Sequence, residues 1–375
     1  MYFFSIFKTV VVAVLGLIGV ISVYWHSDNW LKDSVRHSIT LFPSTHRTGV
    51  HDDKESNSDK LAQCTIPDRL GRMRRVCQAV TPLEQPYLQN WKLRREALYN
   101  LSLHDLQHVV RKIISDENHK VLFCTIPKTG STSWRYHLVK NSDKFMSNNT
   151  AAEKNPNVHS PDYLKKYNIR YLNTMSKDKI LYRLDNYFTF LNVRHPLDRL
   201  LSSYNEKFFF NTAYKESMGV DIIQRYRKNA VKDALQNGTG VTFTELLTSL
   251  LDRIKLQKEL DVHWENYFNL CYPCMIRYDY VAKMESSSSD LSYIISQHLS
   301  DNYVEENLNV KKDHSKIFTS GEEVLMKYTE VDRKLFDELL DYYKLDMDMF
   351  GYSATRNINT GEIRIKCGEM NGGCC

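Results

Sequence analysis

The stretch Val121–Lys140, VLFCTIPKTGSTSWRYHLVK, decides the fold of this chain. Its first residues, Val121–Ile126, are mostly apolar and predict a short buried strand that ends at Pro127. A turn of small polar residues follows. Apolar residues then recur near helical spacing, which predicts a helix that begins around Thr132.

The turn between this strand and helix has the composition of an anion-binding site. A strand, a polar turn and a helix N-terminus together point free backbone N–H groups at a bound anion. Lys128 adds a positive charge, and the hydroxyl groups within Thr129–Ser133 add donors. The turn is not a Walker A loop, because Lys128 precedes Gly130 and no glycine opens the loop. It therefore predicts a phosphate site, with an ordinary turn rich in small polar residues as the alternative.

A second unit of strand, polar turn and helix occurs further along the chain. Tyr187–Val193 predicts a strand, and Arg194 and His195 follow at its C-terminal end. Pro196 suits the first turn of a helix, and apolar residues then recur at helical spacing through Phe208. Ligands bind at the C-terminal ends of strands in open α/β sheets, so Arg194 is a second candidate anion contact. A surface salt bridge is the alternative role for this arginine.

The remaining sequence predicts further elements and contains no internal repeat. Thr242 and Glu245 form a capping-box start to an amphipathic helix. The other predicted elements are helices over Leu93–Leu106, Val109–Ile114 and Val331–Tyr343 and a strand over Met275–Val281. The last residues, 356–375, predict a polar tail.

The composition limits the classes of function. The chain has 375 residues, of which 42% are hydrophobic and 25% charged, as in ordinary globular proteins. A net charge of +5 does not indicate nucleic acid as a partner, although it is compatible with an acidic substrate.

The N-terminus predicts a membrane anchor. Thr9–Trp25 contains no charged residue and is near the lower limit for a membrane-spanning helix, about 17–25 residues. A cleaved signal peptide is the alternative, but the run ends without an A-x-A-like cleavage site. Lys8 precedes the run, so the positive-inside rule places the short N-terminus in the cytoplasm and the rest in a lumen. We therefore expect a single-pass type II membrane protein.

A location in a lumen affects how the asparagines and cysteines are interpreted. Asn100, Asn148 and Asn237 each begin an N-x-[ST] triplet and are candidate glycosylation sites. The eight cysteines become candidates for disulfide bonds: Cys64, Cys77, Cys124, Cys271, Cys274, Cys367, Cys374 and Cys375. Cys271-x-x-Cys274 is alternatively half a zinc site or a redox pair, but no second paired set at zinc spacing follows it.

Two polar turns after two strands suggest one ligand with two separated anionic groups, and a nucleotide phosphorylated at both ends fits. The first turn lies in IPKTGSTSW and the second in VRHPLDRLLSSY. Two later blocks are HWENYFNLCYPCMIRYDYVAKMES and DYYKLDMDMFGY. In this order the blocks resemble Golgi carbohydrate sulfotransferases, in the branch with the chondroitin and dermatan 4-O-sulfotransferases. The likeness covers roughly residues 72–353.

The resemblance implies a fold and a reaction. The fold would be α/β, a P-loop-like sulfotransferase fold whose central parallel sheet is flanked by helices. The donor would be 3′-phosphoadenylyl sulfate (PAPS), and no metal ion would be needed. Its sulfuryl group would go to a hydroxyl of a glycan, a hexosamine or galactose unit of a glycosaminoglycan or glycoprotein chain such as chondroitin. The partners would then be a glycan acceptor and the Golgi membrane, with the catalytic domain lumenal and no nucleic acid.

Residue roles follow from the same resemblance. The residues that would bind the donor are Pro127, Lys128, Thr129, Gly130, Ser131, Thr132, Ser133, Arg194 and Ser202. Lys128 would also neutralise charge on the leaving oxygen. A base must take the proton of the sugar hydroxyl, and His159 is the first candidate, with Glu206 and His263 as rivals. A surface-loop histidine is the alternative role for His159.

The chain then divides into five parts. These are a cytoplasmic tail over residues 1–8, a transmembrane signal anchor over 9–25, a stem over 26–71, a sulfotransferase catalytic domain over 72–355 and a C-terminal tail over 356–375.

The first loop departs from its branch, and this departure affects the acceptor rather than the donor. The branch favours P-K-V-A-C-[ST]-N-W, whereas this chain has P-K-T-G-S-T-S-W, which is closer to the general sulfotransferase loop.

Two other functions compete with sulfuryl transfer. One is a nucleotide-phosphate kinase with a degenerate P-loop, and the other is a non-catalytic glycan-binding Golgi protein.

Overall fold

The computed structural model describes residues 66–80, 91–147, 157–299, 321–357 and 360–367, which all belong to the unit Lys60–Cys375. The predicted cytoplasmic tail, the anchor, and the stem up to residue 65 lie outside these residues, as do Cys64, Asn148, Cys374 and Cys375. Within the ranges just given, no helix is both long and apolar enough to cross a membrane.

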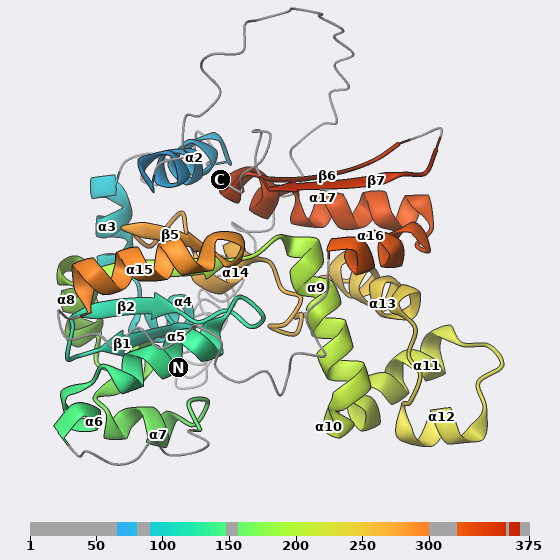
Figure 1. Ribbon diagram of the computed structural model, residues 1–375, viewed down its shortest axis with the longest axis horizontal. Coiled ribbons are helices and arrows are strands. Elements are labelled where there is room, and N and C mark those ends of the chain that lie inside the picture. The colour runs from blue at the N-terminus through green and yellow to red at the C-terminus, as the bar shows by residue number, and fades with distance from the viewer. Residues whose placement is uncertain (1–65, 81–90, 148–156, 300–320, 358–359, 368–375) are drawn as a thin grey trace, which may run out of the picture. The chain divides into compact units, whose positions relative to one another are not determined.

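A five-stranded sheet forms the centre of the fold, in the order β3-β1-β2-β4-β5 (Figure 1). Its strands are β1 (Ile113–Asp116), β2 (Val121–Cys124), β3 (Ile169–Tyr171), β4 (Phe188–Val193) and β5 (Tyr280–Lys283). β2, β4 and β5 are parallel to one another, whereas β1 runs antiparallel to both of its neighbours. The expected parallel sheet is therefore a mixed sheet with a parallel core.

Two of the predicted elements were wrong in type or position. The helix expected over Val109–Ile114 is instead the end of one helix at Val109 and the start of β1. This apolar run is short enough to suit either structure, and pairing of Ile113 with Cys124 of β2 selects the strand. The strand expected over Met275–Val281 begins only at Tyr280, because the chain before it makes turns in which Met275 N donates to the carbonyl of Tyr272.

Helices surround the sheet, and their bounds are as follows: α2 (Ile66–Val80), α3 (Trp91–Asn100), α4 (Leu103–Val109), α5 (Ser131–Lys140), α6 (Asp143–Ser147), α7 (Pro161–Lys166), α8 (Lys177–Asn186), α9 (Pro196–Tyr204), α10 (Thr212–Tyr214), α11 (Val220–Tyr226), α12 (Lys232–Asn237), α13 (Phe243–Lys255), α14 (Tyr267–Cys271), α15 (Ser287–His298), α16 (Gly321–Thr329) and α17 (Arg333–Phe350). α2 begins within the range expected to be stem. α13 has the predicted capping box, and α17 is longer at its C-terminal end than the predicted Val331–Tyr343.

The main core lies between the sheet and two helices, α5 and α15. Phe123 of β2 stacks on Phe190 of β4 with ring centroids 4.7 Å apart, and Trp134 of α5 lies 4.8 Å from the same Phe190 ring. Leu291 and Ile294 of α15 belong to the same buried cluster. Burial of these large side chains fixes α5, and therefore its N-terminus, against the parallel strands.

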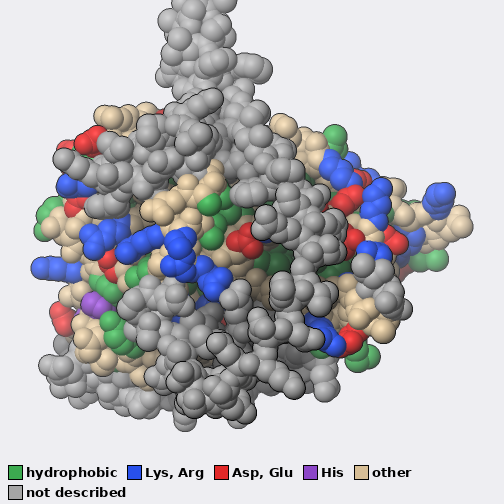
Figure 2. All heavy atoms as spheres, turned by 90° about the horizontal axis from the view of Figure 1, so that it is seen from above, with side chains coloured by type: hydrophobic (Ala, Val, Ile, Leu, Met, Phe, Trp, Pro, Cys, Tyr) green, Lys and Arg blue, Asp and Glu red, His purple; other side chains and the backbone are tan. Residues whose placement is uncertain are grey.

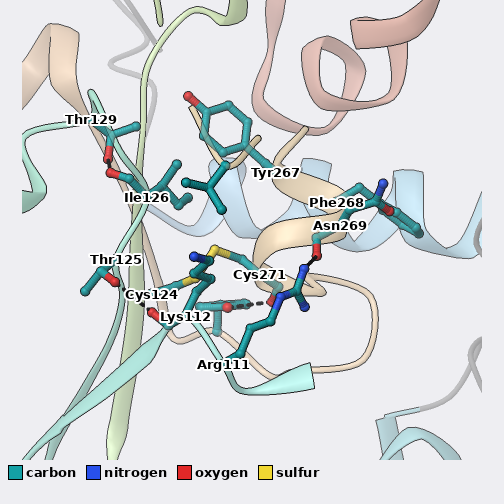
Figure 3. Close-up of a disulfide and its surroundings, with 12 residues drawn as sticks. Arg111, Lys112, Cys124, Thr125, Ile126, Thr129, Tyr267, Phe268, Asn269 and Cys271 are labelled. Atoms are coloured by element: carbon teal, nitrogen blue, oxygen red, sulfur yellow. Dashed lines mark hydrogen bonds between the residues drawn. A yellow bond between two sulfur atoms is a disulfide. The ribbon is translucent and has the colours of Figure 1, made fainter. Parts of the chain in front are cut away.

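Two disulfides join segments that are far apart in the sequence. Cys124 at the end of β2 bonds to Cys271 at the end of α14 (Figure 3), and Cys77 of α2 bonds to Cys274. The prediction that Cys271 and Cys274 are disulfide cysteines is confirmed, and each of them pairs with a cysteine far away in the sequence. The first bond lies just before the polar turn that begins at Pro127.

The end of the chain differs from the predicted polar tail. β6 (Tyr352–Arg356) and β7 (Ile363–Cys367) pair as an antiparallel two-stranded sheet. Alternating residues of both strands are polar, and Ile363 is buried. Because every second residue of these strands is polar, the sequence of this segment resembles that of a polar tail. The strands are recognised only once their pairing is seen.

We expect loss of the Cys124–Cys271 bond to lower the free energy of unfolding by about 2–5 kcal/mol, because the bond closes a loop of 147 residues. The double variant Cys124→Ala/Cys271→Ala, compared with the unaltered chain in urea, measures this loss. The matched control Cys77→Ala/Cys274→Ala removes the other bond and should cost a similar amount. A peptide map of the unreduced protein in which Cys271 is joined to Cys274 would contradict this connectivity.

Candidate active site

The two predicted polar turns lie side by side in the structure. β2 and β4 are parallel neighbours, with Cys124 opposite Leu191, so the turns that follow them leave the same edge of the sheet. Asn192 Nδ2 in β4 donates to the carbonyl of Thr129 at 2.5 Å. Two turns that are 67 residues apart, counted from Pro127 to Arg194, therefore form one site.

The first turn has an unusual backbone. Lys128 has a φ of +68° and Gly130 a φ of +78°, which are left-handed conformations. α5 begins at Ser131, one residue before the predicted Thr132, and its first intrahelical bond is from Trp134 N to the carbonyl of Gly130. The N–H groups of the three preceding helical residues have no acceptor within the helix, as an anion site at a helix N-terminus requires.

Not every predicted donor of this turn is available. The hydroxyl of Thr129 is buried and donates to the carbonyl of Ile126 at 3.0 Å, so it stabilises the turn. Ser131 is also buried, whereas Thr132 at the next position is exposed. In this arrangement the hydroxyl of Thr129 is engaged within the turn, and its contact with a phosphate stays a prediction.

Lys128 is held by a carboxylate. Its Nζ lies 2.9 Å from Oε2 of Glu206, whose Oε1 is 3.0 Å from Nζ of Lys207. Burial alone would raise the pKa of Glu206, but its hydrogen bonds and attraction to the two lysines outweigh burial and bring the pKa to about 2. Glu206 is therefore ionised at neutral pH. It lies in a π-helical segment, Asn205–Phe210, directly after α9.

The second turn contributes Arg194 and, through α9, Ser202. Arg194 is half-buried, and both its N–H and its carbonyl are hydrogen-bonded to the hydroxyl of Tyr267. Ser202 is buried, and the next residue, Ser203, donates to the carbonyl of His263. The backbone of this turn is thus fixed, while the side chain of Arg194 starts at the same sheet edge as Lys128.

His159 lies beside the first turn. Arg135 Nη1 is 2.8 Å from its Nδ1, and the hydroxyl of Thr132 is 3.1 Å from its Nε2. Because a guanidinium can only donate, Nδ1 must accept and the neutral ring carries its proton on Nε2. Desolvation and the charge of Arg135 lower the pKa of His159, so this neutral form dominates at pH 7.

His263, the other histidine, has a different set of partners. Its Nδ1 is 2.6 Å from Oδ1 of Asp261, whose Oδ2 accepts from the hydroxyl of Tyr214 at 2.8 Å. The carboxylate therefore fixes the ring proton on Nδ1. Burial lowers the pKa of His263 although the carboxylate opposes this shift.

Sequence reasoning missed the residues that join the parts of the site. Arg199 of α9 is fully buried and donates to the carbonyls of Pro127, Glu265 and Val262. Nothing in the helical sequence PLDRLLSSY marks this arginine as a buried one. Arg135, likewise buried in α5, could not be linked to His159 by any local pattern.

Comparisons with known proteins show what this chain is similar to. A family model described as "Sulfotransferase family" matches residues 111–353. Carbohydrate sulfotransferase 9 of Homo sapiens is 34% identical over 66% of this chain and 55% of its own length. Carbohydrate sulfotransferase 11 of Mus musculus is 31% identical over 68% of this chain and 69% of its own length. Carbohydrate sulfotransferase 14 of Danio rerio is 32% identical over 68% of this chain and 66% of its own length. The chain thus spans just over half the length of the first of these relatives. No solved structure matches.

Among the residues the structure describes, no group of three or more His, Cys, Asp or Glu side chains is placed to hold a metal ion.

We expect Gly130→Ala to destabilise the protein more than a matched change elsewhere. Any residue other than glycine at this φ costs roughly 1–2 kcal/mol, and the added Cβ would lie 3.2 Å from Sδ of Met284. Gly240→Ala is the control, because Gly240 has a φ of +81° but no atom within 4 Å of such a Cβ. Urea unfolding of both variants gives the comparison, and equal losses would show that the close contact is unimportant.

Proposed function

Because this chain belongs to the sulfotransferase family, we propose that it is a carbohydrate sulfotransferase that transfers a sulfuryl group from PAPS to a hydroxyl of a glycan. The single observation that carries the proposal is the parallel pairing of β2 and β4. Because of this pairing, the turns after β2 and β4 leave the same edge of the sheet. This supports a site in which Lys128 and the N-terminus of α5 would bind one anionic end of a nucleotide, and Arg194 and Ser202 the other.

The first turn suits the reacting end of the donor. The free N–H groups of Ser131, Thr132 and Ser133 would bind the 5′-phosphate. Lys128 would meet the bridging oxygen, on which negative charge grows as the S–O bond breaks. In the ligand-free arrangement Oε2 of Glu206 lies 2.9 Å from Nζ of Lys128, so the donor would compete with that carboxylate for the lysine side chain.

The second turn suits the end that does not react. Arg194 would bind the 3′-phosphate, with two parallel hydrogen bonds where the geometry allows them. Ser202, which follows two turns along α9, would add a hydroxyl donor. Pro127 and Gly130 shape the first loop rather than donate to the ligand.

The rival functions have less support. A kinase with a degenerate P-loop is disfavoured because Lys128 precedes Gly130, the reverse of the Walker order. A non-catalytic glycan-binding protein would not need Lys128 and Arg194 in two turns that leave the same sheet edge.

The acceptor is proposed as a hexosamine or galactose unit of a glycosaminoglycan or glycoprotein chain such as chondroitin. Three kinds of relative support a sugar acceptor, since their names all read carbohydrate sulfotransferase. Lys and Arg side chains gather on one part of the face drawn in Figure 2, and the net charge is +5. Such a surface favours the approach of an anionic polymer.

The location is proposed as the Golgi membrane, with Thr9–Trp25 as a type II signal anchor and the catalytic part in the lumen. The two disulfides support an oxidising compartment, because cytosolic proteins rarely keep such bonds. Protease protection of the C-terminus in intact vesicles tests the topology, and its digestion without detergent would refute it.

The proposed activity predicts both nucleotide binding and transfer. Adenosine 3′,5′-bisphosphate, the spent donor, should raise the Tm of the lumenal part, because it binds the folded state only. ATP with magnesium should raise it less. Radiolabelled PAPS should then label at least one member of a panel of desulfated glycans, and a stronger response to ATP would favour the kinase alternative.

Lys128 and Arg194 should affect different kinetic constants. Lys128→Ala should lower kcat by about 10²-fold or more, because the ammonium group acts mainly on the transition state. Arg194→Ala should mainly raise KM for PAPS, through the loss of about 2–4 kcal/mol of binding to a phosphate that does not react. Lys255→Ala, which removes an exposed ion pair, is the control and should change neither constant.

If a well-folded Lys128→Ala variant kept full turnover, the proposed mechanism would have to be abandoned.

A further inference from the structure

Transfer to a hydroxyl needs a base, and the three candidates differ in whether they have a lone pair to offer. His159 is the candidate nearest the first turn. Its Nδ1 lone pair accepts from Arg135, and its Nε2 carries the proton and is bonded to Thr132. In this arrangement His159 is a hydrogen-bond donor toward the site. Glu206 is ionised but already accepts from Lys128 and Lys207, which makes it a very weak base.

His263 has the arrangement that a general base needs. Asp261 accepts from Nδ1 at 2.6 Å, so the lone pair of the neutral ring is on Nε2. Within the described part of the chain, no hydrogen bond to this Nε2 is found. The hydroxyl of Tyr214 and the backbone N–H of His263 also donate to Asp261, so the carboxylate is fixed from two further directions. The side chain keeps 15% of its surface exposed, so it is not sealed off from solvent.

The backbone on either side of His263 is joined to the first turn. Arg199 donates to the carbonyl of Val262 at 2.8 Å and of Glu265 at 2.7 Å, and the same guanidinium donates to the carbonyl of Pro127, the residue before Lys128. One buried side chain therefore spans the distance between the two segments.

Side chains connect the same two segments a second time. Lys128 is paired with Glu206, and Glu206 with Lys207. Nζ of Lys207 lies 4.6 Å from the centroid of the Tyr214 ring, and the hydroxyl of Tyr214 contacts the pair formed by Asp261 and His263. A continuous chain of side-chain contacts thus links His263 to Lys128.

We propose that His263, oriented by Asp261, is the general base that activates the acceptor hydroxyl. This inference rests on the proposed function and adds a catalytic residue to it. Nε2 of His263 takes the hydroxyl proton while the hydroxyl oxygen forms a bond to the sulfur of the donor. The bond from that sulfur to the 5′-phosphate oxygen breaks, and its electron pair stays on the phosphate oxygen. The products are a sulfate ester and adenosine 3′,5′-bisphosphate, and the imidazolium then releases its proton to solvent.

Asp261 is a positioning residue in this scheme, and it gives the pH profile a definite direction. The charged groups around His263 are Asp261, Lys207 and Glu206, and the net effect of burial and these groups lowers its pKa below the ordinary 6.5. The base works when neutral, so kcat should rise with pH and level off, with its acid limb below 6.5. Asp261→Asn removes a carboxylate that raises this pKa, so the limb should move to lower pH.

The test compares His263→Ala with His159→Ala, and His104→Ala serves as an exposed control. His263→Ala should lower kcat by about 10²–10⁴-fold, the usual contribution of general base catalysis. His159→Ala should lower it by less than about tenfold, and His104→Ala should not change it. Asp261→Asn should lower kcat and shift the acid limb, which a purely structural role would not do. A stabilising response of each variant to adenosine 3′,5′-bisphosphate shows that it is folded. If His263→Ala is not folded, His263→Gln takes its place.

A second measurement does not depend on turnover. Two-bond ¹⁵N–¹H spectra of the histidine rings should show His263 protonated on Nδ1 and His159 on Nε2. A folded His263→Ala enzyme with full kcat, or a His263 ring protonated on Nε2, would overturn the assignment. If the unaltered protein transferred no sulfuryl group to any glycan, the proposed function would fail, and the spectra would still decide the tautomer of His263.

Discussion

The site depends on one buried guanidinium that is satisfied entirely by backbone carbonyls. Arg199 is inaccessible to solvent and donates to three carbonyl groups, those of Pro127, Val262 and Glu265. A buried charge without such partners would be strongly destabilising, so the two chain segments that supply the carbonyls must stay together with α9. The positions of Lys128 and His263 follow from this requirement, because both are adjacent to bonded residues.

The parts of the fold that sequence could predict are those set by local patterns. Strand, polar turn and helix are contiguous in Val121–Lys140, and the proline at the start of α9 marks the second unit just as locally. The antiparallel β1 and the hairpin strand β7 could not be predicted, because each depends on a partner strand. The choice between helix and strand at Ile113 is made by pairing with Cys124, not by its own neighbours in sequence.

The candidate site shows the same division. Lys128 and Arg194 could be identified because each directly follows a recognisable strand. The protonation of His159 could not, since it is set by Arg135, which is 24 residues earlier. A histidine in a sequence has two equivalent nitrogens, and only its neighbours in space determine which of them has a lone pair to use.

The connectivity of the disulfides has a consequence for biosynthesis. Cys77 and Cys124, which are both made long before residue 270, bond to partners near that residue, and not to each other. At a synthesis rate of about 5–20 residues per second, Cys124 waits about 7–30 s before Cys271 has been made. During that time Cys77 is its nearest described neighbour among the cysteines already made. Correct maturation therefore requires that this premature pair be avoided, or be undone by thiol exchange once the second half of the sheet has been translated.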